Sequence, residues 1–142
     1  MIASTVAPLN SSAIVLDASV VVELLLGTTA GKHAMARLQA ADAALHAPEL
    51  LDVEVMHVLR RVVARGGMTE RRAEQALRVF EALPLTRHRH GPLRSRCWQL
   101  RANLTAYDAT YVALAEGLGA TLLTRDARLA RSPWLAASVE LV

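Results

Sequence analysis

Short apolar runs that alternate with helix-forming stretches restrict the fold of this chain more than any other feature. Residues that favour strands are concentrated in five runs, at 13–17, 44–48, 83–88, 120–124 and 138–142. The stretches between these runs show the helical spacing of apolar residues, and Gly or Pro stands at most of their ends. Strands that alternate with helices favour βαβ units and a parallel sheet that is covered on both faces. We therefore predict a single α/β domain with a sheet of about five parallel strands.

The helical stretches have recognisable start and stop residues. Gly27 ends the first, Pro48 precedes the third, and Thr69 caps the fourth. The predicted helices cover residues 18–27, 31–40, 49–64, 70–83, 92–102 and 106–117. No internal repeat, low-complexity tract or interdomain linker interrupts this pattern.

Length and composition agree with one folded domain. The chain has 142 residues, of which 53% are hydrophobic, and this excludes a disordered chain. We assign residues 13–142 to the domain and residues 1–12 to a flexible N-terminal extension, because the extension lacks the basic start and long apolar stretch of a signal peptide. The longest apolar run is broken by Asp17 and Glu23 and is too short to span a bilayer. Because Cys97 is the only cysteine, no intrachain disulfide can form, and a cytoplasmic protein is expected.

The positive charge of the chain comes almost wholly from arginine. Fifteen Arg and one Lys outweigh 13 acids to give a net charge of +3, and the segment 87–101 carries no acid at all. The planar guanidinium group of Arg binds phosphate through two parallel hydrogen bonds. A solvated basic surface explains any single Arg, so the composition is compatible with a phosphate-rich partner without establishing one.

Four acids stand at positions that a parallel sheet would bring together. Asp17 ends the first predicted strand, Asp126 follows the fourth, and Asp108 begins the helix that leads into the fourth. Ligands of open parallel sheets bind beyond the carboxyl ends of the strands, where the strand order reverses. If the first and fourth strands are neighbours, these three acids face one crevice. Glu54 lies on the border of the apolar stripe of its helix, whereas Asp52 lies nearer the polar side and ranks second.

Each of these acids also has a purely structural interpretation. Asp17 and Asp126 can each cap a helix, and Glu54 can hold its carboxylate in water. Asp108 can complete a capping box that starts at Thr105. Capping does not explain several acids at one sheet edge, because packed like charges repel unless a cation lies between them. Carboxylates suit Mg²⁺ or Mn²⁺, which activate water and neutralise charge on a phosphodiester, so we predict a divalent-metal site for phosphate chemistry.

Three segments together resemble a known family. They are VLDAS (15–19), PELLDVEVMHVLRR (48–61) and LTAYDATYVALAEGLGATLLTRDARLA (104–130). In this order and spacing they resemble the PIN domain, and within it the VapC-type ribonuclease toxins of toxin–antitoxin pairs. The resemblance implies a parallel sheet in the order 3-2-1-4-5. It also implies a metal-dependent endoribonuclease that hydrolyses phosphodiester bonds in a structured RNA, either tRNA or rRNA.

The resemblance assigns roles to individual residues. The catalytic and metal-binding acids of the family correspond to Asp17, Glu54, Asp108 and Asp126. The hydroxyl residues that support those acids through hydrogen bonds correspond to Ser19 and Thr124. The chain departs from the family at Ser19, where Asn is frequent, and at His57, where related toxins often carry Asn. The implied cofactor is Mg²⁺, with Mn²⁺ as a substitute, and the implied partners are RNA, a VapB-like antitoxin and a second copy of the chain.

Other functions remain as alternatives. Phosphoaspartyl chemistry also places Asp at the end of the first strand, but its phosphatases need a second Asp where this chain has Ser19. A receiver domain needs a Lys late in the fold, whereas the only Lys is Lys32. A Rossmann domain needs a G-x-G-x-x-G motif after the first strand, and this motif is missing. The main alternative is a catalytically silent PIN-like module that binds RNA or protein, and the intact acids argue against it.

Overall fold

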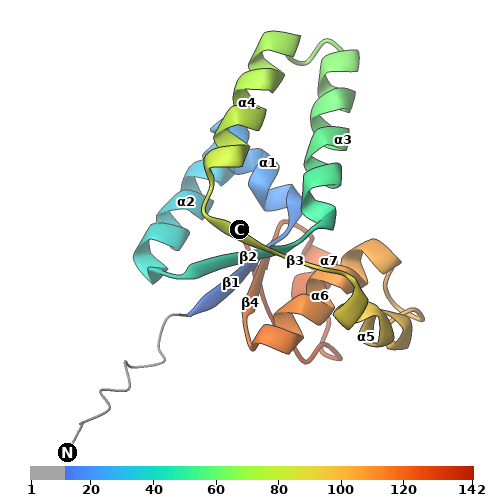
Figure 1. The fold of residues 1–142 in the computed structure, drawn as a ribbon. Coiled ribbons are helices and arrows are strands. Elements are labelled where there is room, and N and C mark those ends of the chain that lie inside the picture. Colours follow the sequence, from blue (N-terminus) through green and yellow to red (C-terminus); the bar gives the residue numbers. More distant parts are fainter. Residues whose placement is uncertain (1–11) are drawn as a thin grey trace, which may run out of the picture.

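The computed structural model describes residues 12–142 and contains one sheet of five parallel strands (Figure 1). The strands are β1 (Ala13–Leu16), β2 (Ala44–Pro48), β3 (Leu85–His88), β4 (Thr121–Thr124) and β5 (Ser138–Leu141). Their order is β3-β2-β1-β4-β5, which confirms the predicted order. The predicted N-terminal extension, residues 1–12, lies outside the described residues except for Ser12.

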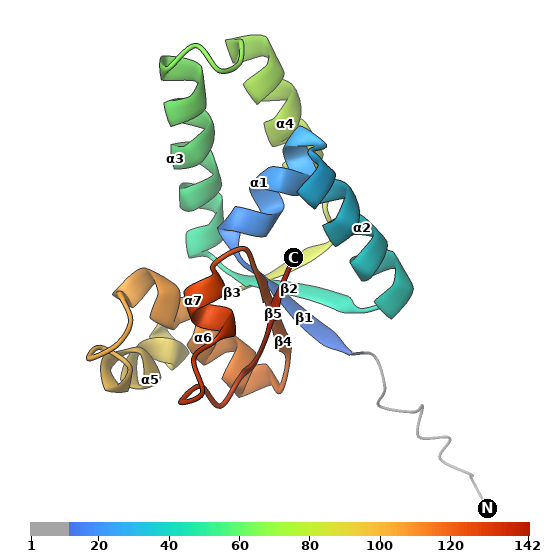
Figure 2. The same ribbon diagram turned by 180° about the vertical axis from the view of Figure 1, so that it is seen from behind.

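Helices cover both faces of the sheet, as Figures 1 and 2 show. The helices are α1 (Ala18–Leu26), α2 (Thr29–Ala41), α3 (Leu50–Ala64), α4 (Glu70–Ala82), α5 (Arg94–Gln99), α6 (Ala106–Leu118) and α7 (Ala127–Ala130). The first four lie on one side of the sheet, and the last three lie on the other side. Within residues 12–142, no helix has both the length and the apolar character needed to cross a membrane.

The two faces of the sheet support two separate hydrophobic cores. Ile14 and Leu16 of β1 pack into the core formed with α1 to α4. Val15, which lies between them in the sequence, packs into the core formed with α6. Successive side chains of a strand point to opposite faces, so a strand that is buried on both faces is apolar at every position. This explains the uninterrupted apolar runs in the sequence.

Most predicted elements are confirmed within one to three residues at their ends, but the segment after Pro92 differs. The single helix predicted over 92–102 is a 3₁₀ turn (Gly91–Leu93) followed by α5, which ends at Gln99. Leu100, the C-cap residue of α5, is buried, and its carbonyl accepts hydrogen bonds from the backbone N–H groups of Asn103 and Leu104. These bonds turn the chain toward α6. The four-residue helix α7 was not predicted.

Candidate active site

The carboxyl ends of β1 and β4 lie side by side and define the site. The register pairs Leu16 with Leu123, so Asp17 and Thr124 follow at the same edge of the sheet. The backbone N–H of Asp17 donates to the Leu123 carbonyl at 3.0 Å. The sequence places an acid after each of these two strands, and the observed strand order brings both acids to one edge.

The Asp17 carboxylate is held by two hydroxyl groups. Its Oδ2 accepts hydrogen bonds from Ser19 Oγ at 2.9 Å and from Thr124 Oγ1 at 2.7 Å. Asp17 occupies the N-cap position of α1, but its side chain makes no capping hydrogen bond, so the capping interpretation does not explain it. Ser19 Oγ in turn accepts from the backbone N–H of Arg125, and Thr124 Oγ1 accepts from that of Asp126. The hydroxyls therefore join the ends of β1 and β4 through Asp17.

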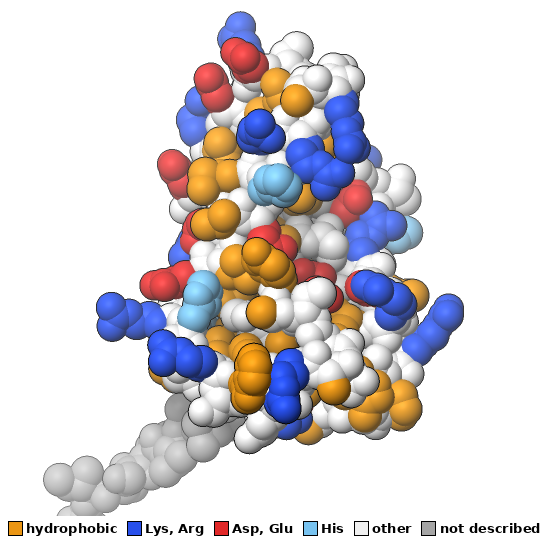
Figure 3. Space-filling view, turned by 90° about the vertical axis from the view of Figure 1, so that its right-hand side faces the viewer, with side chains coloured by type: hydrophobic (Ala, Val, Ile, Leu, Met, Phe, Trp, Pro, Cys, Tyr) orange, Lys and Arg blue, Asp and Glu red, His pale blue; other side chains and the backbone are white. Residues whose placement is uncertain are grey.

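Glu54 of α3 and Asp108 of α6 face Asp17 closely enough for their charges to interact. Burial raises the pKa of Glu54, and the charges of Asp17 and Asp108 raise it further. Burial also raises the pKa of Asp108, again with contributions from Asp17 and then Asp126. Figure 3 shows acidic side chains near the middle of one face, with apolar side chains beside them and Lys or Arg toward the edges. The four acids therefore form one electrostatically coupled group.

Asp126 differs from the other three acids because an arginine neutralises it. Its Oδ1 accepts from the backbone N–H of Arg128 at 2.8 Å, which confirms that Asp126 caps α7. The Arg128 guanidinium also contacts both carboxylate oxygens, at 3.2 and 2.8 Å. The hydrogen bond from the Arg128 side chain lowers the pKa of Asp126, and the Arg128 charge partly opposes the raised pKa of Asp108.

Two buried atoms of the site have no hydrogen-bond partner among the described residues, namely Glu54 Oε1 and the Tyr111 hydroxyl. Tyr111 is only 2% exposed, and burial next to Glu54 and Asp17 raises the pKa of its hydroxyl far above the ordinary value. The hydroxyl therefore stays protonated. Unpaired buried polar atoms are rare in folded proteins and are frequent at functional sites.

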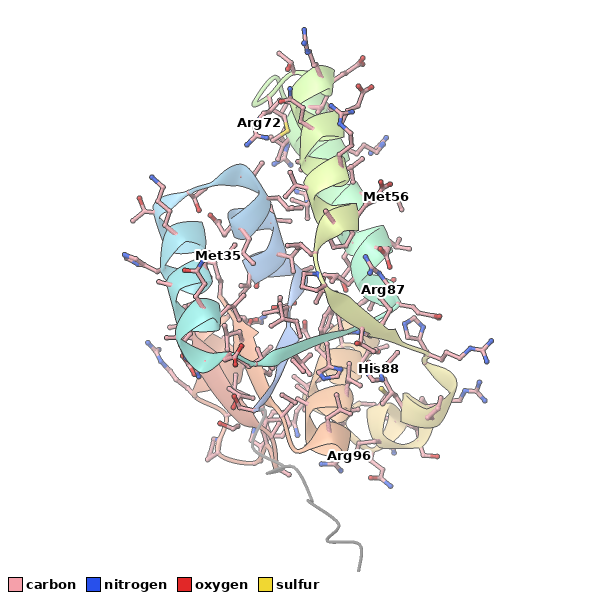
Figure 4. The ribbon with its side chains drawn as sticks, turned by 60° about the vertical axis from the view of Figure 1, so that its left-hand side comes forward. Met35, Met56, Arg72, Arg87, His88 and Arg96 are labelled. Atoms are coloured by element: carbon pink, nitrogen blue, oxygen red, sulfur yellow. The ribbon has the colours of Figure 1, made fainter. Side chains whose placement is uncertain are left out.

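Asp52, the competing acid on α3, does not belong to this group. Its carboxylate forms an ion pair with Arg87 of β3, with Nε and Oδ2 2.7 Å apart. Figure 4 shows Arg87 where β3 passes the lower part of α3. The lower predicted rank of Asp52 thus agrees with the structure.

A comparison with protein families shows to which family the chain belongs. The family model for the PIN domain matches residues 14–135, which include all four acids. The chain belongs to the PIN-domain family.

The most similar relatives of this PIN domain that we compared are VapC proteins. It is 43% identical over 129 residues to "Ribonuclease VapC12" of Mycobacterium tuberculosis, and the match covers 91% of this chain and 98% of the relative. Among solved structures, it resembles VapBC2 from Rickettsia felis with a TM-score of 0.64 at 15% identity, covering 92% of this chain and 98% of the other. A toxin–antitoxin complex from Klebsiella pneumoniae also gives a TM-score of 0.64, at 18% identity and 89% and 95% coverage. At these identities the structures support the fold.

The donor set of this PIN domain fits a divalent cation. Carboxylate oxygens are the ligands that Mg²⁺ and Mn²⁺ prefer, and Glu54 Oε1 has no other partner among the described residues. In the described conformation, no three His, Cys, Asp or Glu side chains of residues 12–142 are close enough together to hold a metal ion. Arg128 holds Asp126, so this acid would have to be released before it could bind a metal.

Sequence analysis missed two residues that shape this site. Tyr111 lies within the helix predicted over residues 106–117 and was not singled out, although it lies one helical turn after Asp108 and so shares its face of α6. Arg128 was counted only among the basic residues, although it follows the cap residue Asp126 by two positions. The spacing from each acid was the available signal in both cases.

Proposed function

We propose that this PIN domain is a divalent-metal-dependent endoribonuclease that acts as the toxin of a toxin–antitoxin pair. Its substrate would be a structured cellular RNA, tRNA or rRNA, and it would act in the cytoplasm. The observation that carries the proposal is the convergence of Asp17, Glu54 and Asp108 at one sheet edge, where burial and the charges of neighbouring acids raise the pKa of Glu54 and of Asp108. The repulsion among these charges destabilises the fold unless a cation relieves it. The name of the M. tuberculosis relative, a ribonuclease, supports RNA as the substrate.

Asp17, Glu54 and Asp108 would hold the metal, with Asp126 joining them once Arg128 releases it. When bound, Mg²⁺ or Mn²⁺ supplies a water of lowered pKa and neutralises negative charge on the phosphodiester. Ser19 and Thr124 orient the Asp17 carboxylate by donating hydrogen bonds to Oδ2. Because both bonds go to Oδ2, Oδ1 is the Asp17 oxygen available to a metal.

Arg128 and Tyr111 contribute in different ways. Arg128 compensates the charge of Asp126 and weakens the repulsion on Asp108, so it stabilises the metal-free site. Once released from Asp126, the Arg128 guanidinium could contact a phosphate of the RNA. Tyr111 keeps its proton and stands beside Glu54, where its buried ring excludes water from one side of that carboxylate.

We infer the protein partners from the compared proteins. The structures from R. felis and K. pneumoniae are a VapBC protein and a toxin–antitoxin complex, and a VapB-like antitoxin is proposed here on that basis. Homodimer formation remains a prediction. The alternative function is a silent module that binds RNA or protein without cleaving it. It does not explain why acids that repel one another lie together at this site.

Induction of the protein without its antitoxin is expected to create discrete new RNA 5′ ends. The test is transcriptome-wide mapping of 5′ ends for the unmodified chain and for Asp108→Asn, which removes one coupled carboxylate without changing its size. The ends should vanish in the variant, and their positions would identify the RNA. If the unmodified chain is folded and creates no new ends, the silent module becomes the better explanation.

The metal-free protein should lose stability as the pH rises, and Glu54→Gln should reduce that loss. The pKa of Glu54 is raised in the folded state, so the folded protein favours the protonated form. The stabilisation is complete below the unfolded pKa of about 4 and is lost as the pH rises through the folded pKa. In EDTA, the melting temperature of Glu54→Gln should therefore exceed that of the unmodified chain at neutral pH but not at pH 3.

Addition of Mg²⁺ at neutral pH should raise the melting temperature of the unmodified chain above that of Glu54→Gln, because the cation binds the charged form of Glu54 in the unmodified chain. Asp108→Asn is the second variant to measure, because burial and the neighbouring acids also raise the pKa of the Asp108 carboxyl. Equal melting curves for all three proteins in EDTA at neutral pH would contradict the coupling of these acids.

A further inference from the structure

The exposed ring of Tyr107 separates two adjoining cavities. Tyr107 precedes Asp108 in the first turn of α6 and is 63% exposed. The first cavity has a volume of about 380 Å³ and is lined by Leu50, Val53, Glu54, His57 and Tyr107. The second has a volume of about 370 Å³ and is lined by Leu50, His90, Arg94, Cys97, Ala106, Tyr107 and Thr110. Because Leu50 and Tyr107 line both, the second cavity adjoins the one that Glu54 lines, and its size is within the range of ligand sites.

The walls of the second cavity suit a flat aromatic ligand. Leu50, Ala106 and the Tyr107 ring supply apolar surface, while polar groups stand at only a few points. Nucleobases stack on exposed aromatic side chains, and this stacking tolerates any base because every base has a π-face. Arg94 is exposed and forms no ion pair with the described residues, so its guanidinium is free to bind RNA.

The polar groups of the second cavity can pair with the edge of a base. His90 Nε2 accepts a hydrogen bond from the Leu50 backbone N–H at 3.0 Å, so the neutral ring carries its proton on Nδ1 and can donate from there. Arg94 also only donates. Thr110 Oγ1 gives its hydrogen to the Ala106 carbonyl at 2.7 Å and lies 3.8 Å from Cys97 Sγ, so it can only accept. The cavity therefore offers both donors and an acceptor to a base.

We propose that this second cavity binds the base of an unpaired nucleotide next to the scissile phosphate. The Tyr107 ring would stack on the base, while His90, Arg94 and Thr110 would pair with its polar edge. The base must be unpaired, because a base inside the cavity cannot pair with another strand. This inference rests on the proposed function and adds a base-binding subsite to it.

The test measures RNA binding in EDTA, so that binding is read without cleavage. Fluorescence anisotropy with a labelled single-stranded oligo(U) is expected to show weaker binding by Tyr107→Ala, by roughly 5- to 150-fold, because the stacking partner is lost. Tyr107→Phe keeps the ring and should bind within about twofold of the unmodified chain. The matched control is Trp98→Ala, since Trp98 is 68% exposed but lines neither cavity. Equal losses in Tyr107→Ala and Trp98→Ala would overturn the subsite.

Arg94 has its own measurement. Arg94→Gln should weaken the binding of oligo(U) and of oligo(C), because it removes a cation that forms no ion pair with the described residues. Equal affinity of Arg94→Gln and the unmodified chain would contradict a role of Arg94 in the subsite.

Cleavage assays separate this inference from the proposed function. If the chain cleaves RNA with Mg²⁺ and Tyr107→Ala binds and cleaves as well, the subsite is wrong and the nuclease stands. If the chain binds oligo(U), loses that binding in Tyr107→Ala and cleaves no RNA, the subsite stands and the nuclease is wrong. Tyr107 is mostly exposed, so circular dichroism should show that Tyr107→Ala is folded.

Discussion

Replacement of Asp17 by Asn is expected to reduce RNA cleavage by at least about 100-fold. Asp17 is the acid whose charge acts on both Glu54 and Asp108, and it lies where β1 meets β4. The amide oxygen of Asn can still accept the hydrogen bonds from Ser19 and Thr124, so the change removes the charge and leaves the scaffold. Cleavage of a mapped RNA fragment in Mg²⁺ would measure the rate. Isothermal titration calorimetry should show the loss of Mg²⁺ binding in parallel.

Asp52→Asn provides the matched control for Asp17→Asn. The substitution is the same, but Asp52 is paired with Arg87 and stands outside the coupled acids. Partly exposed ion pairs contribute little to stability, so this variant should remain folded and cleave RNA within about threefold of the unmodified rate. A folded Asp17→Asn variant that retained more than a tenth of the rate would contradict the proposed metal site.

The strands and helices could be predicted because the signals that set them are local. The run from Ala13 to Leu16 is apolar at every position because the strand is buried on both faces, and glycine or capping residues mark the helix ends. The order of the strands depends on non-local pairing, and only the family resemblance supplied it. The segment after Pro92 was mispredicted because no Gly or Pro marks the end of α5 in the sequence, and the turn that begins at Leu100 is set by backbone hydrogen bonds.

The acids of the site could be predicted from topology, whereas the state of each carboxylate could not. The sheet order places Asp17 and Asp126 at one edge regardless of their side-chain conformations. Arg128 neutralises Asp126, whereas Glu54 keeps an unpaired oxygen. Both states depend on rotamers and burial, which sequence spacing does not determine. Tyr107 illustrates the same limit, because the sequence reveals an aromatic residue but not that it separates two cavities.

Gly31→Ala is expected to destabilise the fold by about 3 kcal/mol and to lower the melting temperature by roughly 10 °C. Gly31 lies in the first turn of α2, where the helix passes close to the end of α1. A Cβ atom at this position would stand 2.0 Å from the Glu23 carbonyl oxygen and 2.5 Å from its carbon. Both are backbone atoms, so the two helices must separate. The separation would also disturb the Glu23 side chain, which binds Thr28 and forms an ion pair with Arg125 beside the site.

The same substitution at Gly117 should have the opposite effect, which makes it the matched control. Gly117 lies inside α6 and is exposed, and a Cβ atom there meets no atom within 4 Å. Ala in place of Gly in a helix interior stabilises by about 0.5–1 kcal/mol. Urea unfolding monitored by circular dichroism would give both free energies of unfolding.

Because α1 also positions Ser19 at the site, Gly31→Ala should lose RNA cleavage together with stability, whereas Gly117→Ala should keep RNA cleavage. If Gly31→Ala were as stable as the unmodified chain, the packing of α1 against α2 would have to differ from the one described.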